Sequence, residues 1–453
     1  MLNRSAYRLY RVLSSAQYRV FRRFTKAGLL LLTALILVAF LAMDIDQTSA
    51  HETFSLLACL LLVSMLTAPF FRARFAVRRN LPRFGSVGEP LAYQLILQNL
   101  TVKPQHDLVV LENLADPRPD FREFADALRA ARETRSFRLT TPTPKRRGGQ
   151  VQERSAPSLT PHGQVEVPME LIPFSRGPLW FRGTAIARAD PFGLFRGFVN
   201  VPLAQSVLIL PKRYPLPPIA LPGNMKYQQG GVALASSVGQ SEEFVSLRDY
   251  RPGDPMRHIH WKSWAKTGRP IVKEFLDEFF VRHALVLDTF AGPGKEEAFE
   301  EVVSIAASFA CTLRTQESLL DLMFVGPDAF CFTSGRSLAH TDQMLEILAA
   351  VRPCREKPFA ALSDLVAGHA SSLSGCICVF LEWDEPRRDL VRRMKSMAMP
   401  MLVLLVTATD GSELLSRIPA EDRPERFHVL TVGKIAEGLR KLSGTSGGAG
   451  GLR

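Results

Sequence analysis

The sequence predicts a multidomain chain with an N-terminal transmembrane hairpin of two helices, an antiparallel β-sandwich in the middle and a C-terminal α/β domain with a mostly parallel sheet. Two long uncharged apolar runs lie within the first 71 residues. Short runs bounded by Gly, Pro and Asn follow, and after residue 240 apolar runs alternate with helical patterns. The predicted boundaries are 1–26 for a basic amphipathic segment, 27–71 for the hairpin, 75–215 for the sandwich, 240–442 for the α/β domain and 443–453 for a flexible tail.

The hairpin is predicted from residues 27–43, AGLLLLTALILVAFLAM, and residues 54–71, FSLLACLLLVSMLTAPFF. Each run has about the length needed to cross a bilayer core of roughly 30 Å. The ten residues between them contain no Lys or Arg, whereas both outer flanks are rich in Arg. The positive-inside rule therefore predicts two spans with both termini in the cytoplasm. A buried helical hairpin of a soluble protein is the alternative; a cleaved signal peptide fits less well, because a second apolar run follows at once.

The net charge of +12 is concentrated near the N-terminus. Residues 1–83 carry twelve basic and three acidic side chains, so the remaining 370 residues contribute only +3. A protein body that binds nucleic acid needs a concentrated basic face, which this balance does not provide. Residues 1–26 interleave seven basic residues with Tyr, Leu, Val and Phe, a pattern typical of a helix lying on anionic lipid. We therefore expect membrane lipid as a partner and no nucleic acid.

The middle region is predicted to form short strands with turn signals between them, as in an antiparallel sandwich. The predicted strands lie within 90–100, 107–114, 164–174, 179–189 and 206–214. Residues 118–137 interrupt this rhythm with helical spacing, which indicates a helical insertion. The segment ADPFGLFRGF, residues 189–198, combines turn residues with apolar anchors and is interpreted as a structural corner.

The C-terminal region alternates strand and helix patterns, which predicts a parallel sheet covered on both faces. Strands are predicted within 283–288, 319–326, 376–383, 400–408 and 427–432, and helices within 295–316, 340–351, 385–397 and 434–442. Ligand sites of such sheets form beyond the carboxyl ends of the strands, where Asp288 follows the first strand. The following GPGKEEAF lacks the spacing and the hydroxyl of a phosphate-binding loop. Five of the six cysteines fall in this last third, in mostly apolar surroundings, and are predicted to be reduced and buried.

The most polar stretch of the chain is SLRDYRPGDPMRHIHWKSWAKTGRPIVKEF, residues 246–275. In RPGDP, Pro252 fixes φ and Gly253 is free to adopt a positive φ, so a tight turn is predicted. Asp254 is expected to accept backbone N–H bonds within this turn. The arginines nearby offer planar guanidinium groups for bidentate pairing with carboxylates. The candidate arginines are Arg248, Arg251 and Arg257, and the candidate acids are Asp249, Asp254, Glu242 and Glu243.

The segment RHIHWKSW alternates in character and is predicted to be a strand. Ile259, Trp261 and Ser263 would share one face, with Ile259 and Trp261 anchoring the segment to the α/β core. A structural polar network that also serves as a partner surface is the favoured interpretation. The alternatives are zinc ligation by His258 and His260, base catalysis by a His–Asp pair without a recognisable Ser or Cys nucleophile, and nucleic-acid contact.

The same stretch resembles a bacterial family known as domain of unknown function 58, whose pattern is R-x-Y-x-x-G-D-x-x-R-x-I-x-W-x-x-x-A. The matching residues here are Arg248, Tyr250, Gly253, Asp254, Arg257, Ile259, Trp261 and Ala265. The resemblance implies an α/β domain similar to von Willebrand factor A domains, anchored in the bacterial inner (cytoplasmic) membrane. The partners it implies are a MoxR-type AAA+ ATPase or other von Willebrand factor A proteins. It implies no reaction, and we expect a non-catalytic adaptor or scaffold without a cofactor.

Von Willebrand factor A domains often bind Mg²⁺ through D-x-S-x-S after the first strand. Asp288 matches the Asp, but Phe290 and Gly292 replace the two Ser. Because Mg²⁺ requires nearly octahedral oxygen ligation, losing two hydroxyls weakens the site. Asp288 and Asp384 remain incomplete metal candidates. The alternative function is therefore a metal-dependent binding protein or hydrolase that uses Asp288, Asp254 and the His258/His260 pair.

Overall fold

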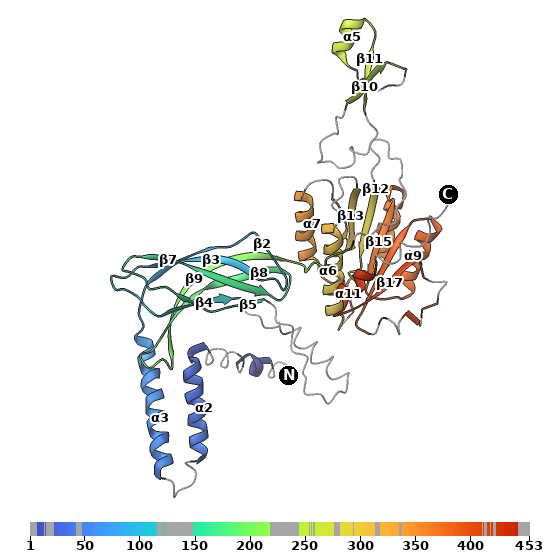
Figure 1. Cartoon of the computed structure of the whole chain (residues 1–453). Coiled ribbons are helices and arrows are strands. Elements are labelled where there is room, and N and C mark those ends of the chain that lie inside the picture. The colour runs from blue at the N-terminus through green and yellow to red at the C-terminus, as the bar shows by residue number, and fades with distance from the viewer. Residues whose placement is uncertain are drawn as a thin grey trace. The chain divides into compact units, whose positions relative to one another are not determined.

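The computed structural model divides the chain into two compact units, Met1–Leu210 and Pro211–Arg453 (Figure 1). The residues that the structure describes are 7–12, 14, 22–41, 48–115, 121, 148–217, 244–252, 254, 256, 259–275, 281–292, 294–312, 318–334, 338–409, 411, 415–416, 418–419 and 423–442. The predicted helical insertion at 118–137, apart from Phe121, and the predicted tail at 443–453 lie outside these residues.

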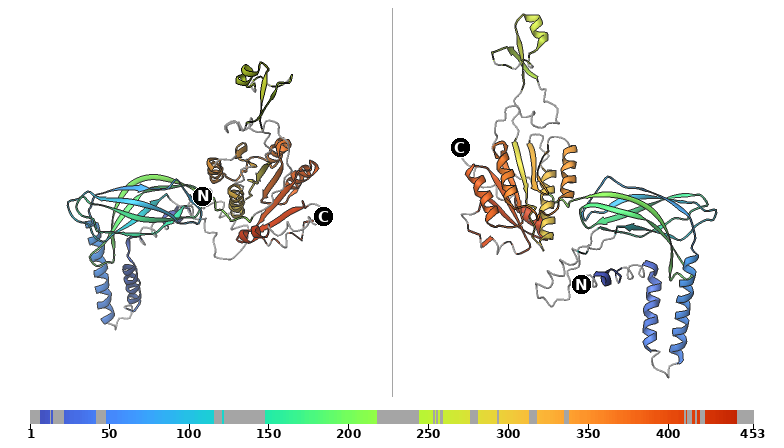
Figure 2. Two further views of the ribbon diagram at one scale, coloured as in Figure 1. Left: turned by 45° about the horizontal axis from the view of Figure 1, so that its top comes forward. Right: turned by 180° about the vertical axis from the view of Figure 1, so that it is seen from behind.

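Two apolar helices, α2 (Lys26–Leu41) and α3 (Thr48–Thr67), lie side by side in the first unit (Figures 1 and 2). Residues Ser49–Phe70, which include the 3₁₀ helix η1 (Ala68–Phe70), form a helix of 22 residues that contains an 18-residue stretch with a mean hydropathy of 2.0. Among the described residues this helix alone has the length and composition to cross a membrane, and α2 is a shorter apolar helix. Both helices expose large apolar side chains. These include Leu30, Leu37, Phe40, Leu56, Leu62, Leu66 and Phe70.

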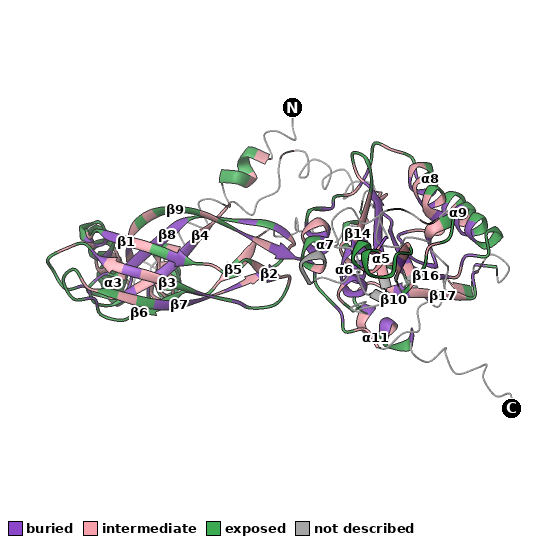
Figure 3. Ribbon diagram, turned by 90° about the horizontal axis from the view of Figure 1, so that it is seen from above, coloured by how far each residue is buried: buried purple, intermediate pink, exposed green. Residues whose placement is uncertain are grey.

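The strands that the structure describes in the first unit form a sandwich of two sheets around an apolar core. One sheet has the order β1 (Phe75–Asn80), β3 (Leu91–Asn99), β7 (Gln164–Pro173) and β5 (Gly149–Val151). The other has the order β2 (Phe84–Ser86), β9 (Arg196–Leu210), β8 (Gly177–Ala189), β4 (Leu108–Leu114) and β6 (Arg154–Ala156). Burial alternates along β3, so one face of that strand meets the core (Figure 3). All the pairs are antiparallel except β2–β9.

A buried ion pair crosses this core. Arg79 of β1 binds both carboxylate oxygens of Glu112 on β4, at 2.8 Å from Nε and 2.6 Å from Nη2, and both side chains are fully buried. The Thr184 hydroxyl, 3.0 Å from Glu112 Oε2, and the Tyr93 hydroxyl, 3.3 Å from Oε1, also donate to this carboxylate. Arg79 lies over the ring of Phe181 at 4.3 Å from its centroid. The two sheets are therefore joined by a satisfied polar network as well as by apolar packing.

The segment predicted as a corner connects the helices to the sandwich. In this junction turn, residues 190–195, the Asp190 carboxylate accepts the backbone N–H groups of Phe192, Leu194 and Phe195 at 2.7–3.1 Å. The same carboxylate accepts the hydroxyl of Ser64 on α3 at 2.7 Å. Burial would raise the pKa of Asp190, but these donors outweigh it and hold the pKa below its ordinary value.

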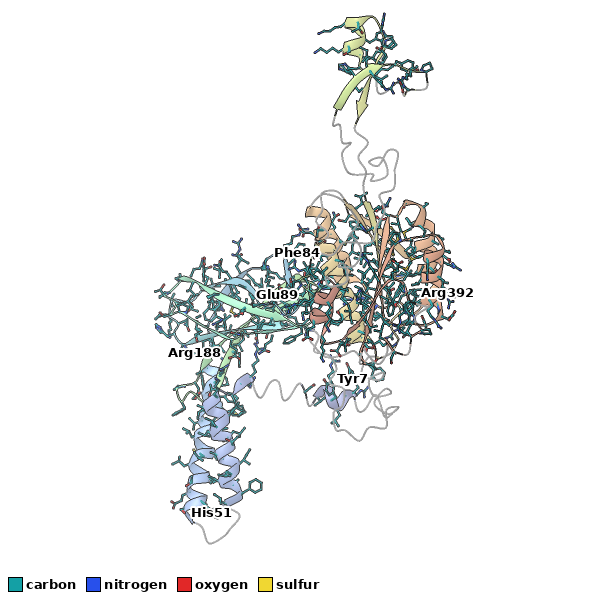
Figure 4. All side chains as sticks on the ribbon, turned by 45° about the vertical axis from the view of Figure 1, so that its right-hand side comes forward. Tyr7, His51, Phe84, Glu89, Arg188 and Arg392 are labelled. Carbon is teal, nitrogen blue, oxygen red and sulfur yellow. The ribbon has the colours of Figure 1, made fainter. Side chains whose placement is uncertain are left out.

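The helix α2 meets the same turn. The Thr25 hydroxyl donates to the Gly193 carbonyl at 2.5 Å, and Phe24 packs edge-on against Phe195 with ring centroids 5.0 Å apart. Gly28 lies so close that a Cβ there would overlap the Leu194 carbonyl oxygen. On β8, Arg188 lies over the Phe71 ring at 4.5 Å and is labelled in Figure 4. The junction turn therefore contacts both helices.

The second unit contains a mixed sheet of six strands that is mostly parallel. Its order is β14 (Ala329–Ser334), β13 (Ser318–Val325), β12 (Val281–Leu287), β15 (Gly375–Phe380), β16 (Met401–Thr407) and β17 (Arg426–Thr431). The five predicted strands are present and parallel, and β14 pairs antiparallel with β13. The strand β15 is buried along its whole length, as expected for a sheet covered on both faces.

Helices cover both faces of this sheet (Figure 1). They are α6 (Glu296–Thr312), α7 (Leu338–Ala350), α8 (Ala360–His369) followed by η3 (Ala370–Ser372), α9 (Glu385–Ser396) and α11 (Ile435–Arg440). The helix α8 was not predicted from the sequence; it contacts β13 and β14. Cys354, Cys376 and Cys378 are buried free thiols, as predicted, whereas Cys311 and Cys331 are half-buried.

Candidate functional site

The carboxyl end of the first parallel strand carries a closed ionic cluster. Asp288 follows β12 and is fully buried. Its Oδ1 accepts the Phe290 N–H at 3.0 Å, and its Oδ2 accepts the Leu381 N–H at 3.0 Å. Oδ2 also accepts Arg387 Nε of α9 at 2.7 Å. Every oxygen of this predicted metal ligand is thus already bound within the protein.

Asp384, the second metal candidate, belongs to the same cluster. It precedes α9 as its N-cap, and its Oδ1 accepts the Arg387 N–H at 3.4 Å. Its Oδ2 accepts Arg387 Nη1 at 2.6 Å. One guanidinium therefore bridges Asp288 and Asp384, and its carbon lies 4.7 Å from the centroid of the Phe359 ring. Burial acts to lower the pKa of Arg387, but the two carboxylates outweigh it and raise that pKa, so the bridge stays charged.

The residues of this end of the sheet do not fit a magnesium ion. The guanidinium supplies the positive charge between the two carboxylates. The Thr289 hydroxyl, the nearest hydroxyl in sequence, donates instead to the Val325 carbonyl at 2.5 Å. Within the described part of the chain, no group of three or more His, Cys, Asp or Glu side chains is arranged to hold a metal. Arg387 was missed by the sequence analysis, although its place before Leu390, Val391 and Met394 puts it on the buried face of α9.

Residues 244–275, which contain the polar stretch, include two antiparallel strands and a short helix, and we call them the signature module. The strand β10 (Phe244–Asp249) pairs antiparallel with β11 (Ile271–Phe275) in a sheet of two strands, and α5 (Trp261–Thr267) lies between them in sequence. Gly268 ends the helix with φ of 69°, and its N–H donates to the Trp264 carbonyl. Gly253, Arg257 and His258 lie outside the described residues.

The turn of the signature module pairs one of the candidate arginines with one of the candidate acids. Arg248 binds Asp254 in bidentate fashion, with Nη1–Oδ2 and Nη2–Oδ1 distances of 2.7 and 2.8 Å. Asp254 Oδ2 also accepts the Arg251 N–H at 2.8 Å, so the predicted backbone bond within the turn is present. Tyr250 donates its N–H to the Pro270 carbonyl. Ile259 is buried and forms a bridge with Val272.

The predicted strand across Trp261 is wrong. Residues 261–267 are helical, because His260 begins the helix: its carbonyl accepts the N–H groups of Ser263 and Trp264, and its Nδ1 lies 2.6 Å from the Ser263 hydroxyl. Trp261 is 63% exposed and so does not serve as a core anchor. The Trp261 indole stacks on Trp264, with ring centroids 5.2 Å apart and planes 19° apart. Asp254 and Arg248 therefore face each other in the turn, while Trp261 faces outward.

The acids and histidines proposed for catalysis are not joined in one described cluster. Asp254 is bound by Arg248, Asp288 is bound by Arg387, and His260 is bound to Ser263. The described contacts thus give Asp254 and Asp288 basic partners of their own rather than a shared site. His258, the fourth residue of that hypothesis, lies outside the described residues.

The Asp254 carboxyl gives a test of this turn. Its bonds to Arg248 and to the Arg251 N–H favour the charged form and lower the pKa from 3.8 to about 2. Because the folded pKa is the lower one, the pairing stabilises the module above about pH 4, and this contribution is lost as the pH falls through about 2. The carboxyl ¹³C shift of Asp254 in the full chain should titrate near pH 2, and the midpoint should rise in Arg248→Met. A wild-type midpoint near 3.8 would contradict the observed pair.

Together these elements define an α/β protein whose mostly parallel sheet is preceded in the chain by a signature module in which an exposed tryptophan stacks on a half-buried one. Residues 246–414 match the family model described as "Protein of unknown function DUF58", which confirms the family resemblance over this segment. One relative is the "Uncharacterized protein YeaD" of Bacillus subtilis (strain 168). It is 27% identical over 184 residues, which are 40% of this chain and 44% of that protein. The chain thus spans less than half of that relative's length.

Solved structures give only remote likenesses. A β-glucosidase from Listeria innocua in complex with gluconolactone matches at 11% identity with a TM-score of 0.16, over 30% of this chain and 16% of the other. An ASH/PapD-like domain of human CEP192 matches at 15% identity with a TM-score of 0.17, over 30% of this chain and 86% of the other. At such TM-scores neither likeness bears on the function.

Proposed function

We propose that this chain is a membrane-anchored, non-catalytic adaptor that presents its α/β unit and signature module to a partner protein in the bacterial cytoplasm. The observation that carries the proposal concerns two residues of the signature module, one bound within the module and one exposed. Its acidic residue Asp254 is occupied by Arg248, while Trp261 is exposed. An exposed indole stacked on a second, half-buried indole is the kind of feature that protein interfaces use as an anchor.

The anchor is proposed to be the pair α2 and α3, crossing the inner membrane twice with both termini in the cytoplasm. The apolar helix Ser49–Phe70 and the exposed apolar side chains of both helices support this, because apolar surface of that extent is stable in lipid and not in water. The Arg-rich flanks at 1–26 and 72–83 support the orientation.

The partner is proposed to be a MoxR-type AAA+ ATPase or another von Willebrand factor A protein, as the family resemblance implies. The ionic cluster at the sheet edge supports a binding role that needs no metal. Arg387 already provides the positive charge that a von Willebrand factor A domain takes from Mg²⁺, so partner binding should be insensitive to chelators.

The full chain should therefore crosslink to an ATPase of this type in native membranes. The measurement is crosslinking in intact cells, solubilisation of the membrane fraction and identification of the linked peptides, with and without a chelator. The control is a chain carrying Arg393→Ala. Arg393 is an exposed residue of α9, so this substitution leaves the ionic cluster of Asp288, Asp384 and Arg387 unaltered. If repeated crosslinking recovered no ATPase and no other protein, the adaptor proposal would fail.

A further inference from the structure

One side of α5 forms a continuous exposed surface of aromatic and basic character. At 100° per residue, Trp264, Trp261, Ala265, Lys262 and Lys266 follow one another around the helix. Trp261, Lys262, Ala265 and Lys266 are exposed, and Trp264 is partly covered by its stack on Trp261. We call this set the tryptophan–lysine surface.

The opposite side of the helix carries Ser263 and Thr267, whose hydroxyls form bonds within residues 260–267. The Ser263 hydroxyl binds His260 Nδ1, and the Thr267 hydroxyl donates to the Ser263 carbonyl at 2.9 Å. The start of the helix is joined to β11 by the His260 N–H, which donates to the Ile271 carbonyl at 2.8 Å, and by the Ile259–Val272 bridge. The tryptophan–lysine surface therefore contributes little to the fold of the module. The presence of exposed Trp and Lys side chains there is not explained by folding.

The charges on this surface are unbalanced. Lys262 and Lys266 are four residues apart and thus neighbours on the helix, where two like charges destabilise it. Within the described residues neither lysine forms an ion pair. The whole module, residues 244–275, carries seven basic and three acidic side chains, and one of those acids, Asp254, is already bound by Arg248. An acidic partner would relieve this imbalance.

We infer that the tryptophan–lysine surface is the docking site for an acidic segment of a partner protein, an inference that rests on the proposed adaptor function. The stacked indoles provide a rigid apolar contact that loses little conformational entropy on binding, and the two lysines bind carboxylates beside it. A membrane surface is the less suitable occupant, because α5 has only seven residues and lacks the long apolar face of an interfacial helix. Nucleic acid is the other occupant that the experiment distinguishes.

The test is a selection of random dodecapeptides on the full chain, held in nanodiscs of zwitterionic lipid. Enriched peptides should carry net negative charge together with an aromatic or aliphatic residue, and their binding should weaken with added salt. Trp261→Ala should weaken the selected peptides by at least about tenfold, and Lys262→Gln/Lys266→Gln by a similar factor. Trp180→Ala removes an equally exposed indole from β8 of the sandwich and should change nothing.

Several results would overturn the inference. They are a selection that enriches no peptide, enriched peptides without negative charge, and peptide binding that is unchanged in Trp261→Ala. If phosphatidylglycerol vesicles bound the same residues more tightly than the selected peptides, the surface would be assigned to lipid instead. If an oligothymidylate of twenty nucleotides did so, it would be assigned to nucleic acid. Hydrogen exchange in β10 and β11 verifies that each variant keeps the module folded. If Trp261→Ala still crosslinked to the ATPase, the adaptor function would stand and this docking site alone would be rejected.

Discussion

Replacing Arg387 with alanine is expected to destabilise the α/β unit by about 3–5 kcal/mol, because it leaves the buried Asp288 carboxylate without its counter-charge. The two backbone N–H bonds from Phe290 and Leu381 remain, but they do not neutralise a fully buried charge. The effect can be measured by hydrogen exchange in peptides of β12 and β15 in the full chain. The equilibrium constant for opening of these strands should be larger in the variant than in the wild type by roughly 10²- to 10³-fold or more.

The control for this variant lies on the same helix. Arg393 pairs with Asp364 at 3.9 Å with both side chains largely exposed, so Arg393→Ala should change stability by less than about 1 kcal/mol. Adding Asp288→Asn to Arg387→Met should recover part of the loss, since it removes the unpaired charge and keeps an oxygen acceptor. Equal effects of Arg387→Ala and Arg393→Ala would show that the cluster does not hold this end of the sheet.

Glu112→Ala is expected to have a loss of similar size in the sandwich, about 3–5 kcal/mol. The substitution leaves the Arg79 guanidinium buried with only the Gln205 side chain, the Thr184 hydroxyl and the Leu203 carbonyl as acceptors. It also removes the acceptor of the Tyr93 hydroxyl. Hydrogen exchange in peptides of β3 and β4 is the measurement, and the α/β unit should be unaffected.

A second ion pair of the sandwich provides the matched control for Glu112→Ala. Arg154 and Glu170 pair at 3.4 Å with side chains 46% and 32% exposed, so Glu170→Ala should cost less than about 1 kcal/mol. Glu112→Gln should fall between the two variants, since the amide keeps an acceptor but loses the charge. A loss for Glu112→Ala no larger than that for Glu170→Ala would mean that Arg79 finds water or another partner on losing Glu112.

The parallel strands of the α/β unit could be predicted because strands that are buried on both faces consist almost entirely of apolar residues. A run such as residues 376–380, which is apolar at nearly every position, fits only a strand covered on both faces. The helices follow from their spacing, except α8. The antiparallel edge strand β14 could not be predicted in the same way, since its residues are mostly exposed or half-buried and its pairing depends on the neighbouring strand β13.

In the signature module, a strand predicted from the alternation of apolar and polar residues is wrong. Residues 257–264 alternate well enough to predict a strand, and that prediction placed Trp261 in the core. A competing signal was present: Lys266 and Gly268 are the basic last turn and the C-terminal glycine of a short helix. In a segment this short, the helical bonds to the His260 carbonyl and the left-handed Gly268 that ends the helix outweigh the alternation of apolar and polar residues. Arg248 and Asp254 were both candidates for such a pair, but the sequence did not single out this pairing among three arginines and four acids.

The ionic cluster could be predicted only in part. Asp288 was found from its place after a strand, but its partner lies 99 residues later, on a helix whose sequence EPRRDLVRRMKS contains four arginines. Nothing local distinguishes the arginine that reaches Asp288, apart from its spacing to the three buried apolar residues of α9. Long-range ionic partners of this kind are set by the packing of helix on sheet.

Under the proposed membrane anchoring, the junction turn has a mechanical consequence. Hydrophobic mismatch changes the tilt of a spanning helix when the bilayer becomes thinner or thicker. Because one short turn contacts both α2 and α3 and continues directly into β9, we expect a change of helix tilt at this junction to be passed on to the sandwich. The thickness of the surrounding membrane would then set the direction in which the sandwich projects from it.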